Sequence, residues 1–405
     1  MNNFAYEGMR RLSPSGEWCV HSYYTLSPYA PDGSGRILIS GADLDGDTTC
    51  VYILSPDGEV LARFGEGKHD TNFYHTGSWQ TWSPDARYVY YQGGDMKNPL
   101  ICRYEVETGR VVTLPGDMEG APPLGEPIIS GFLGMLYAAG YGDGRYHPEN
   151  APIPFEKRDE HGLFRFSPET GTRELALSVN DILAMHPDRE RILAAEREFI
   201  ANTGYAEGFT LMAYCVRWSP VGDRCLFYFG NHCVDRRRGE PKLSYVFTAK
   251  RDLTDIHFVL DMSFGRTGVH WGWHPDGEHL IGYASHPDND MKMCLCSVRY
   301  DGSDFRMISR HASGGHPSIS PTDYNLLVTD ESTAPGRVVF IDLATDTEVG
   351  AYTLPRTFGD KIPMGRNPQK ICHHPIFRKD GKKIIVNILP DRNSAVVEMD
   401  VIERT

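Results

Sequence analysis

The amino-acid sequence predicts an all-β protein made of many short strands joined by tight turns. Three observations lead to this fold class. The composition combines 41 Gly and 27 Pro with 18 Phe, 21 Tyr and 6 Trp, which favours strands and turns. A short phrase recurs along the chain, and a second type of β-rich hairpin lies between its copies. We therefore expect a set of similar sheets.

The recurring phrase is an apolar or aromatic residue, Ser or His, Pro, a turn, and then a β-rich run. Its copies are "LSPSGEWCVHSYY" at 12, "WSPDARYVYYQ" at 82, "WSPVGDRCLFYFG" at 218, "WHPDGEHLIGYAS" at 273, "ISPTDYNLLVTDE" at 319 and "FRKDGKKIIVNIL" at 377. Each copy predicts two strands joined by a turn of the Pro-Asp-Gly type.

Second hairpins such as "VYILSPDGEVLARF" and "VVFIDLATDTEVGAY" complete four-stranded sheets. The last copies of the phrase start 55, 46 and 58 residues apart, close to the period of about 40 to 50 residues in propeller blades. A seventh sheet fits at residues 127–143, where no Pro turn is evident. The prediction is a seven-bladed β-propeller that forms a single domain over residues 1–405.

One segment interrupts the strand pattern. Residues 178–199 predict a helix that Ser178 caps and Pro187 breaks. A long loop precedes this helix. We interpret residues 144–200 as a helical and loop insertion that covers one face of the propeller.

Charge and patterning exclude several classes of protein. The net charge of −13 argues against a nucleic-acid partner, which requires a basic face. No apolar stretch approaches the roughly 20 residues that span a bilayer, and the first residues contain no apolar leader segment. Nine cysteines without a compact spacing indicate reduced thiols. We expect a cytoplasmic protein without membrane contact, either a monomer or a homodimer.

The repeat also shows which residues are equivalent in different blades. Five positions before the turn Pro, or before Lys379 in its place, the phrases have Trp79, Cys215, His270, His316 and His374. Inner strands of all blades run in the same direction along the axis of a propeller, so equivalent residues form a ring. Three histidines from successive blades are therefore expected to face one another.

These histidines are candidate metal ligands. Gln369 and either Cys372 or His373 lie in the segment entering the last blade, beside His374. Imidazoles with an amide oxygen suit a borderline divalent ion such as Mn, Fe, Ni or Zn. The alternative is that the histidines only cap strand ends by hydrogen bonding.

Two stretches resemble the oligogalacturonate lyases, a family of cytoplasmic seven-bladed propellers that degrade short pectin fragments with a divalent metal. "HWGWHPDG", which begins at residue 270, is similar to a His-x-x-Trp-x-Pro-Asp-Gly stretch of that family. "QKICHHP", which begins at residue 369, is similar to a Gln-x-x-His-Pro-His stretch. Residues 35–72 and 146–171 also look like parts of the family. The resemblance implies a small acidic oligosaccharide as substrate and Mn²⁺ as the first candidate ion, with Zn, Fe and Ni as alternatives.

Carried over position by position, the resemblance implies His270, Gln369 and His374 as metal ligands. Cys372 stands where the family has a histidine. It is expected either to bind as a thiolate, which favours a softer metal, or to leave the place to His373. The family's catalytic base, a histidine of a middle blade, corresponds most closely to Cys215.

The implied reaction is β-elimination at a uronate, in which a base removes the proton α to the carboxylate. The carboxylate must be neutralised, and Arg217 is a candidate to do so through a bidentate pair. The alternative for Arg217 is an outward side chain paired with Asp. His232 and Cys215 are the candidate proton acceptors, and His147 and His186 in the insertion are further candidates.

Substrate contacts are expected from Arg217, Tyr283 and His316, and either Tyr283 or Tyr228 is a candidate proton donor to the leaving oxygen. A different class of function also fits the blade phrase, namely a non-catalytic propeller that binds a protein or peptide in a translocation assembly. The row of histidines with Gln369 favours the lyase, because a scaffold does not need such a row.

Overall fold

The structure is a computed structural model of the chain. It describes residues 8–43, 48–68, 76–95, 97–133, 152–231, 238–331, 333, 335–354, 358–361, 368–402 and 404. The side chains of residues 68, 358–361 and 368–370 lie outside this description.

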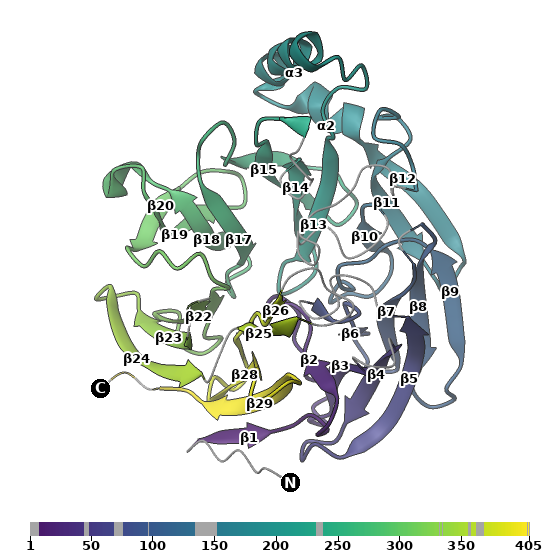
Figure 1. The fold of residues 1–405 in the computed structure, drawn as a ribbon, viewed down its shortest axis with the longest axis vertical. Coiled ribbons are helices and arrows are strands. Elements are labelled where there is room, and N and C mark those ends of the chain that lie inside the picture. The colour runs from purple at the N-terminus through teal and green to yellow at the C-terminus, as the bar shows by residue number, and fades with distance from the viewer. Residues whose placement is uncertain are drawn as a thin grey trace.

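Seven antiparallel sheets stand in a ring around a common axis, which confirms the predicted seven-bladed β-propeller (Figure 1). Blades 1 to 3 are β2 (Trp18–Val20), β3 (Ile37–Asp43), β4 (Thr48–Leu54) and β5 (Val60–Lys68); β6 (Thr81–Trp82), β7 (Tyr88–Gly94), β8 (Pro99–Glu105) and β9 (Val111–Pro115); and β10 (Ile128–Ser130), β11 (Gly162–Ser167) and β12 (Thr172–Ser178).

Blades 4 to 7 complete the ring. They are β13 (Met212–Trp218), β14 (Arg224–Gly230), β15 (Ser244–Lys250) and β16 (His257–Asp261); β17 (Gly268–Trp273), β18 (His279–Ser285), β19 (Met293–Arg299) and β20 (Arg306–Ser309); β21 (Ser318–Ile319), β22 (Leu326–Glu331), β23 (Gly336–Asp342) and β24 (Thr347–Leu354); and β27 (Ile376–Phe377), β28 (Lys383–Ile388), β29 (Ala395–Asp400) and β1 (Met9–Arg11).

Strands from both ends of the chain close the ring. β1 pairs antiparallel with β29 and becomes the outer strand of blade 7. The phrase at residue 12 is therefore not a hairpin of one blade, as the repeat had predicted. It connects β1 of blade 7 to β2 of blade 1. β1 pairs with β29, and β2 pairs with β3, so the two strands on either side of this turn belong to different sheets.

Blade 3 differs from the prediction in the position of its turn. The Gly125 N–H donates to the Pro122 carbonyl oxygen over 2.9 Å, in the same way that the Gly222 N–H donates to the Ser219 carbonyl oxygen in blade 4. The turn that the sequence did not reveal is thus "PPLG", just before β10. Within the described residues this blade has three strands, and residues 134–143 of the predicted sheet lie outside the description.

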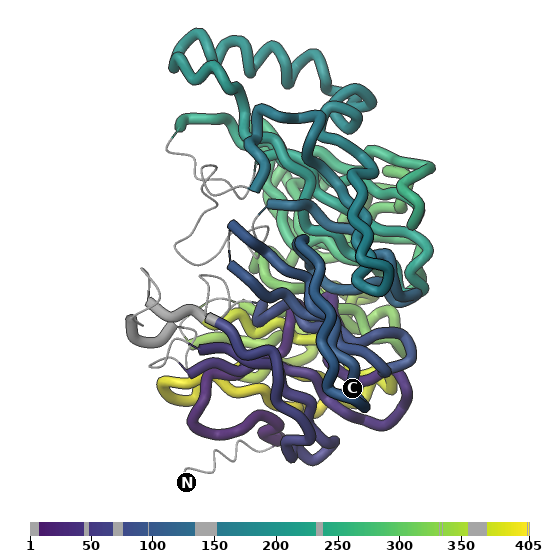
Figure 2. Tube along the Cα trace, turned by 90° about the vertical axis from the view of Figure 1, so that its right-hand side faces the viewer, coloured from purple at the N-terminus to yellow at the C-terminus, as the bar shows by residue number. Residues whose placement is uncertain are grey.

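Two helices follow blade 3, as the sequence predicts. Ser178 caps α2 (Val179–Met185) with its side-chain oxygen, and the chain turns at Pro187 before α3 (Arg189–Thr203). The helices lie at the outer rim of the ring, at its upper edge in Figures 1 and 2, and not over the propeller axis. They pack on apolar side chains of blades 3 and 4, including Phe227 and Phe247, because their apolar residues need a sheet edge to cover them.

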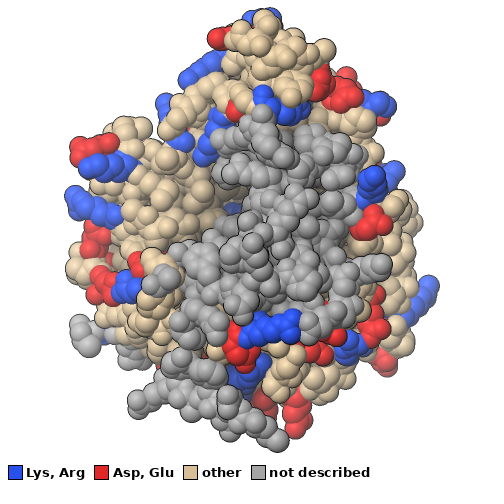
Figure 3. Space-filling view, viewed as in Figure 1, with Lys and Arg blue, Asp and Glu red and all other residues tan. Residues whose placement is uncertain are grey.

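Two small elements remain in the part of the chain that the structure describes. A 3-10 helix η4 (Pro287–Asn289) follows β18, and β25 (Phe358–Lys361) pairs with β26 (Pro368–Lys370) before blade 7. Among the described residues, neither helix has the length and apolar composition needed to cross a membrane. Lys and Arg alternate with Asp and Glu around the described rim of the face in Figure 3.

Candidate metal centre

The inner strands repeat an unusual backbone feature at the equivalent positions that the sequence spacing identified. Trp79, Cys215, His270 and His374 all have left-handed φ angles, between 47° and 58°. The ladders of β13 and β17 shift register around Cys215 and His270. A left-handed residue with a side chain costs roughly 1–2 kcal/mol, and such bulges re-aim side chains. The repeat therefore encodes a local kink as well as a strand.

Three of these equivalent residues form a row of imidazoles near the propeller axis. The ring centroids of His270 and His316 are 4.1 Å apart, and those of His316 and His374 are 4.2 Å apart. They come from blades 5, 6 and 7. The structure thus brings together the three histidines that the spacing predicted to face one another.

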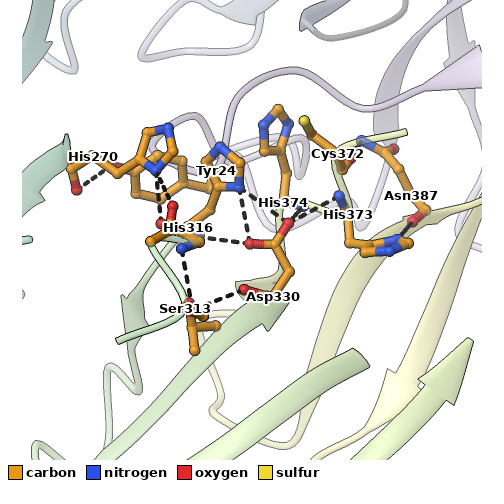
Figure 4. A network of polar contacts seen from close by, with 12 residues as sticks. Tyr24, His270, Ser313, His316, Asp330, Cys372, His373, His374 and Asn387 are labelled. Carbon is orange, nitrogen blue, oxygen red and sulfur yellow. Dashed lines mark hydrogen bonds and ion pairs between the residues drawn. The ribbon is translucent and has the colours of Figure 1, made fainter. Parts of the chain in front are cut away.

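A cysteine joins two of these histidines. One ligand atom from each of His316, Cys372 and His374 lies within 4.8 Å of the other two, and all three residues are buried. Figure 4 shows the Cys372 sulfur close to the His374 ring. Two imidazoles and one thiol suit a borderline transition-metal ion, so the donor set fits the divalent metal that the sequence resemblance implies.

The carboxylate of Asp330, on β22, organises this cluster from behind. Its Oδ1 and Oδ2 lie 2.9 and 3.0 Å from His316 Nδ1, and Oδ1 accepts the main-chain N–H of His316 over 2.7 Å. Oδ2 accepts the main-chain N–H groups of His373 and His374 over 3.1 and 3.3 Å. Burial alone would raise the pKa of Asp330, but His316, through its ring and its main-chain N–H, and the nearby His373 ring lower it well below its usual range.

Asn387 holds the same segment on its other side. Its N–H donates to the His373 carbonyl oxygen over 2.9 Å, and its side-chain amide donates to the Cys372 carbonyl oxygen over 3.3 Å. The His373 ring turns away from the cluster in Figure 4, where Nδ1 lies 2.8 Å from the Asn387 carbonyl oxygen. Of the two alternatives from the sequence, the structure therefore directs Cys372 toward the histidines, and His373 away from them.

His270 lies at the other end of the row and is partly exposed. Its Nδ1 lies 2.9 and 2.8 Å from the carbonyl oxygens of Gly314 and Gly315, so Nδ1 carries the proton and Nε2 has the free lone pair. Burial, followed by the neighbouring His316 and Arg217, lowers the pKa of His270 well below its usual value. The ring is thus a neutral base beside the three-residue cluster.

Arg217 lies inside the ring of blades and among tyrosines. Its Nη1 donates to Tyr24 Oη over 3.3 Å and to the Trp271 carbonyl oxygen, and its Nη2 donates to Tyr23 Oη over 3.2 Å. The guanidinium also lies over the rings of Tyr23, Tyr24 and Tyr228. Arg217 does not point outward to pair with an Asp, which was the alternative that the sequence left open. Within the described residues it forms no ion pair.

Tyr23 and Tyr24 were missed by the sequence reasoning. Tyr24 Oη donates to the His270 carbonyl oxygen over 2.6 Å, and the Tyr23 ring centroid is 4.9 Å from that of His374. Both side chains are buried. The signal was the aromatic pair in "HSYY", which directly follows β2 and leads toward β3 within blade 1.

The remaining predicted residues occupy different surroundings. Cys215 is buried, and its N–H donates to Glu119 Oε1 over 2.8 Å. Tyr283 is fully buried, with its hydroxyl 2.9 Å from Ser313 Oγ and 3.2 Å from Thr329 Oγ1. His186 is buried against Tyr245 beside the helices.

Other candidates are not described by the structure. His232 and His147 lie outside the described residues, and only the main chain of Gln369, in β26, is described. A cavity of about 650 Å³ lies elsewhere, at the ends of the inner strands where the blade turns are, and is lined by Arg224, Arg251 and Gly277 among others. It contains none of the predicted site residues.

Comparison with known proteins adds the fold's relatives. Neither a protein-family model nor a curated protein sequence matches this chain. An oligogalacturonate lyase from Vibrio parahaemolyticus aligns over 97% of this chain and 93% of its own length, with a TM-score of 0.62 and 16% identity. An oligogalacturonate lyase in complex with manganese aligns over the same shares, with a TM-score of 0.63 and 17% identity.

A prolyl endopeptidase aligns over 96% of this chain and 50% of its own length, with a TM-score of 0.53 and 9% identity. At such low identities the comparisons show the fold alone. The chain is a seven-bladed β-propeller whose fold resembles that of the oligogalacturonate lyases.

Proposed function

We propose that the protein is a metal-dependent lyase that cleaves small uronate-containing oligosaccharides by β-elimination. The observation that carries this proposal is the cluster of His316, Cys372 and His374 beside His270 and the buried cation of Arg217. The fold shared with oligogalacturonate lyases supports the same class of reaction. In this proposal the substrate is a small acidic sugar, and neither nucleic acid nor membrane takes part.

The chemistry requires that the uronate carboxylate be neutralised while its α-proton leaves. A divalent ion held by the cluster would supply positive charge for this purpose. Arg217 adds a positive charge behind Tyr23 and Tyr24. The guanidinium is held in place there, because both of its terminal nitrogens donate hydrogen bonds to these tyrosines. Its role is thus electrostatic, in place of the free bidentate fork that the sequence suggested.

A proton acceptor is also required. The Nε2 lone pair of His270 is available to bind the ion or to accept a proton, and the lowered pKa, which makes the ring a weak proton acceptor, favours the first role. His232 and Cys215 remain the other candidates for the base. Tyr283 and Tyr228 remain the candidate proton donors to the leaving oxygen, because Tyr24 Oη already donates its proton to the His270 carbonyl oxygen.

The test is a panel of oligouronides that contains galacturonate, glucuronate and rhamnose-linked members. Elimination leaves a 4,5-unsaturated uronate that absorbs in the ultraviolet, whereas hydrolysis does not. We expect metal-loaded protein to produce this absorbance on at least one member, and we expect a chelator or His374→Ala to abolish it. His279→Ala, which changes a histidine that pairs with Asp276 away from the cluster, is the control.

If metal-loaded protein converts no member of the panel, the lyase proposal fails. The non-catalytic propeller that binds a protein or peptide would then be the better explanation. Saturated products would also contradict the proposal, because they indicate hydrolysis.

A further inference from the structure

We propose that His316, Cys372 and His374 form a nitrogen and sulfur metal site that selects thiophilic divalent ions of the zinc class over Mn²⁺, and that Asp330 is the positioning residue of this site. The inference deepens the proposed function by naming the metal class, and it rests on that function only for its biological use. Its evidence is the arrangement of donors, so metal binding tests it independently of turnover.

The first argument is the identity of the donors. The ligand atoms of the three residues lie within 4.8 Å of one another. In a tetrahedral site with Zn–N and Zn–S bonds of about 2.0–2.3 Å, neighbouring donors lie about 3.3–3.8 Å apart. The observed cluster therefore needs to contract by about 1.5 Å or less. A thiolate donor favours Zn²⁺ or Co²⁺ over the harder Mn²⁺.

The second argument is the way in which Asp330 fixes His316. Both carboxylate oxygens face His316 Nδ1, so the ring carries its proton there and has its lone pair on Nε2. A carboxylate that orients a histidine in this way is the usual outer partner of a metal ligand.

The third argument is that one carboxylate fixes both parts of the cluster. Asp330 accepts main-chain N–H groups from His316 in blade 6 and from His373 and His374 at the entry to blade 7. Its oxygens are occupied by these donors and are therefore not offered as a hard ligand. Since the segment around Cys372 is also held by Asn387, the thiol and the two imidazoles are positioned before any ion binds.

This donor set also changes the charge of the site. A thiolate in place of a neutral ligand lowers the net charge of a bound divalent ion by one unit. The buried cation of Arg217 then supplies a larger share of the positive potential that an anionic substrate meets.

The experiment uses the full-length protein, purified without an affinity tag and stripped with a chelator. Zn²⁺, Co²⁺ and Mn²⁺ are added separately, and binding is measured by competition with a chromophoric chelator. We expect one ion per chain, with Zn²⁺ bound at least about 100-fold more tightly than Mn²⁺, consistent with the affinity order of these ions. The Co²⁺ protein should show a thiolate-to-cobalt charge-transfer band in the near ultraviolet.

Variants assign the band and the selectivity to named residues. Cys372→Ser should lose the band and most of the preference for Zn²⁺, whereas Cys225→Ser, which changes another buried thiol away from the cluster, should retain both. Cys372→His places an imidazole where the thiol stands. It should bind metal without the band and shift the preference toward Mn²⁺, which separates loss of the sulfur from loss of folding.

Asp330→Asn tests the positioning role. We expect Zn²⁺ affinity to fall about 10- to 100-fold and the cobalt spectrum to change, which a merely structural role would not produce. A charge-transfer band that persists in Cys372→Ser, or equal affinity for Mn²⁺ and Zn²⁺ in the unmodified protein, would overturn the proposal. Absence of stoichiometric binding would overturn it as well. Failure on the oligouronide panel with this metal selectivity intact would count against the lyase alone.

Discussion

At the residue scale, burial moves the protonation of two side chains away from their charged forms. Burial raises the pKa of Glu119 to about 7 from its ordinary value of 4.5, against the Cys215 N–H and Arg217, which lower it. Burial lowers the pKa of His186 to about 4 from 6.5. Both residues stay neutral in the folded protein over a range of pH in which they are charged in the unfolded chain.

The two shifts predict opposite pH dependences of stability. Between pH 4.5 and 7 folded Glu119 retains a proton that the unfolded chain loses, so it makes the free energy of unfolding fall as pH rises. Between pH 4 and 6.5 the unfolded chain binds a proton at His186 that the fold excludes, so this residue makes the free energy of unfolding rise with pH. Each slope is at most about 1.4 kcal/mol per pH unit.

Urea unfolding of Glu119→Gln and His186→Asn from pH 4.5 to 6.5 checks this prediction. Gln retains an acceptor for the Cys215 N–H, and Asn retains one for the Asp188 N–H that His186 Nδ1 accepts. Relative to the unmodified protein, Glu119→Gln should make stability increase more steeply with pH and His186→Asn less steeply. Two variants that shift the slope in the same direction would contradict the assignment of these groups.

At the scale of one element, the blade turn depends on a glycine in the left-handed region. Gly277 has a φ of 74°, and its N–H donates to the His274 carbonyl oxygen over 3.0 Å. No atom lies within 4 Å of the position that a Cβ would take there. The conformation alone therefore determines the cost of a side chain at this turn.

Gly277→Ala should lower the free energy of unfolding by about 1 kcal/mol, through backbone strain and without any steric contact. Gly67→Ala in β5 is the matched control. Its φ is not in the left-handed region, and a Cβ would meet only the Thr49 hydroxyl at 3.7 Å, so we expect no loss. Comparison of the two midpoints in urea tests the prediction, and equal losses would indicate that flexibility and not strain is responsible.

These turns also explain which parts of the fold were predictable from the sequence. The number of residues between an inner-strand position and its blade turn is the same in these blades. Counting residues therefore showed that Cys215, His270 and His374 are equivalent, and their shared left-handed φ confirms it. The turn at residues 122–125 has Pro122 in place of the Ser or His that defines the phrase, and it was missed. The phrase at residue 12 has the same local sequence as the others, but closure with β29 decides its role.

The candidate site was only half predictable for a related reason. Asp330 acts on three main-chain N–H groups from two separate segments, and Tyr23 and Tyr24 approach Arg217 from blade 1. Apart from the contact of Asp330 with His316, which lies within blade 6, these contacts join residues from different blades. No periodicity within one blade indicates them, so only the closed ring reveals them.

At the scale of the whole molecule, stability depends on how the ring is closed. Glu398 on β29 is buried, and three groups converge on its carboxylate. Arg10 of β1 donates over 2.9 Å, Arg378 of blade 7 over 3.1 Å, and the Tyr29 hydroxyl of blade 1 over 3.0 Å. One side chain thus joins the N-terminal strand, the last blade and the first blade.

Glu398→Gln should therefore weaken closure more than its size change would suggest. We expect the free energy of unfolding to fall by about 2 kcal/mol, less than for a fully buried pair because both arginines are partly exposed. Glu278→Gln, which removes an exposed pair with Arg299, should change stability by less than about 0.5 kcal/mol.

Removal of residues 1–11 should have a larger effect of a second kind, because β29 then becomes an unpaired sheet edge that favours association between molecules. Size-exclusion chromatography with light scattering would detect that association. A truncated protein that stays as monodisperse as the full chain and unfolds at the same urea concentration would show that the ring does not need β1 for closure.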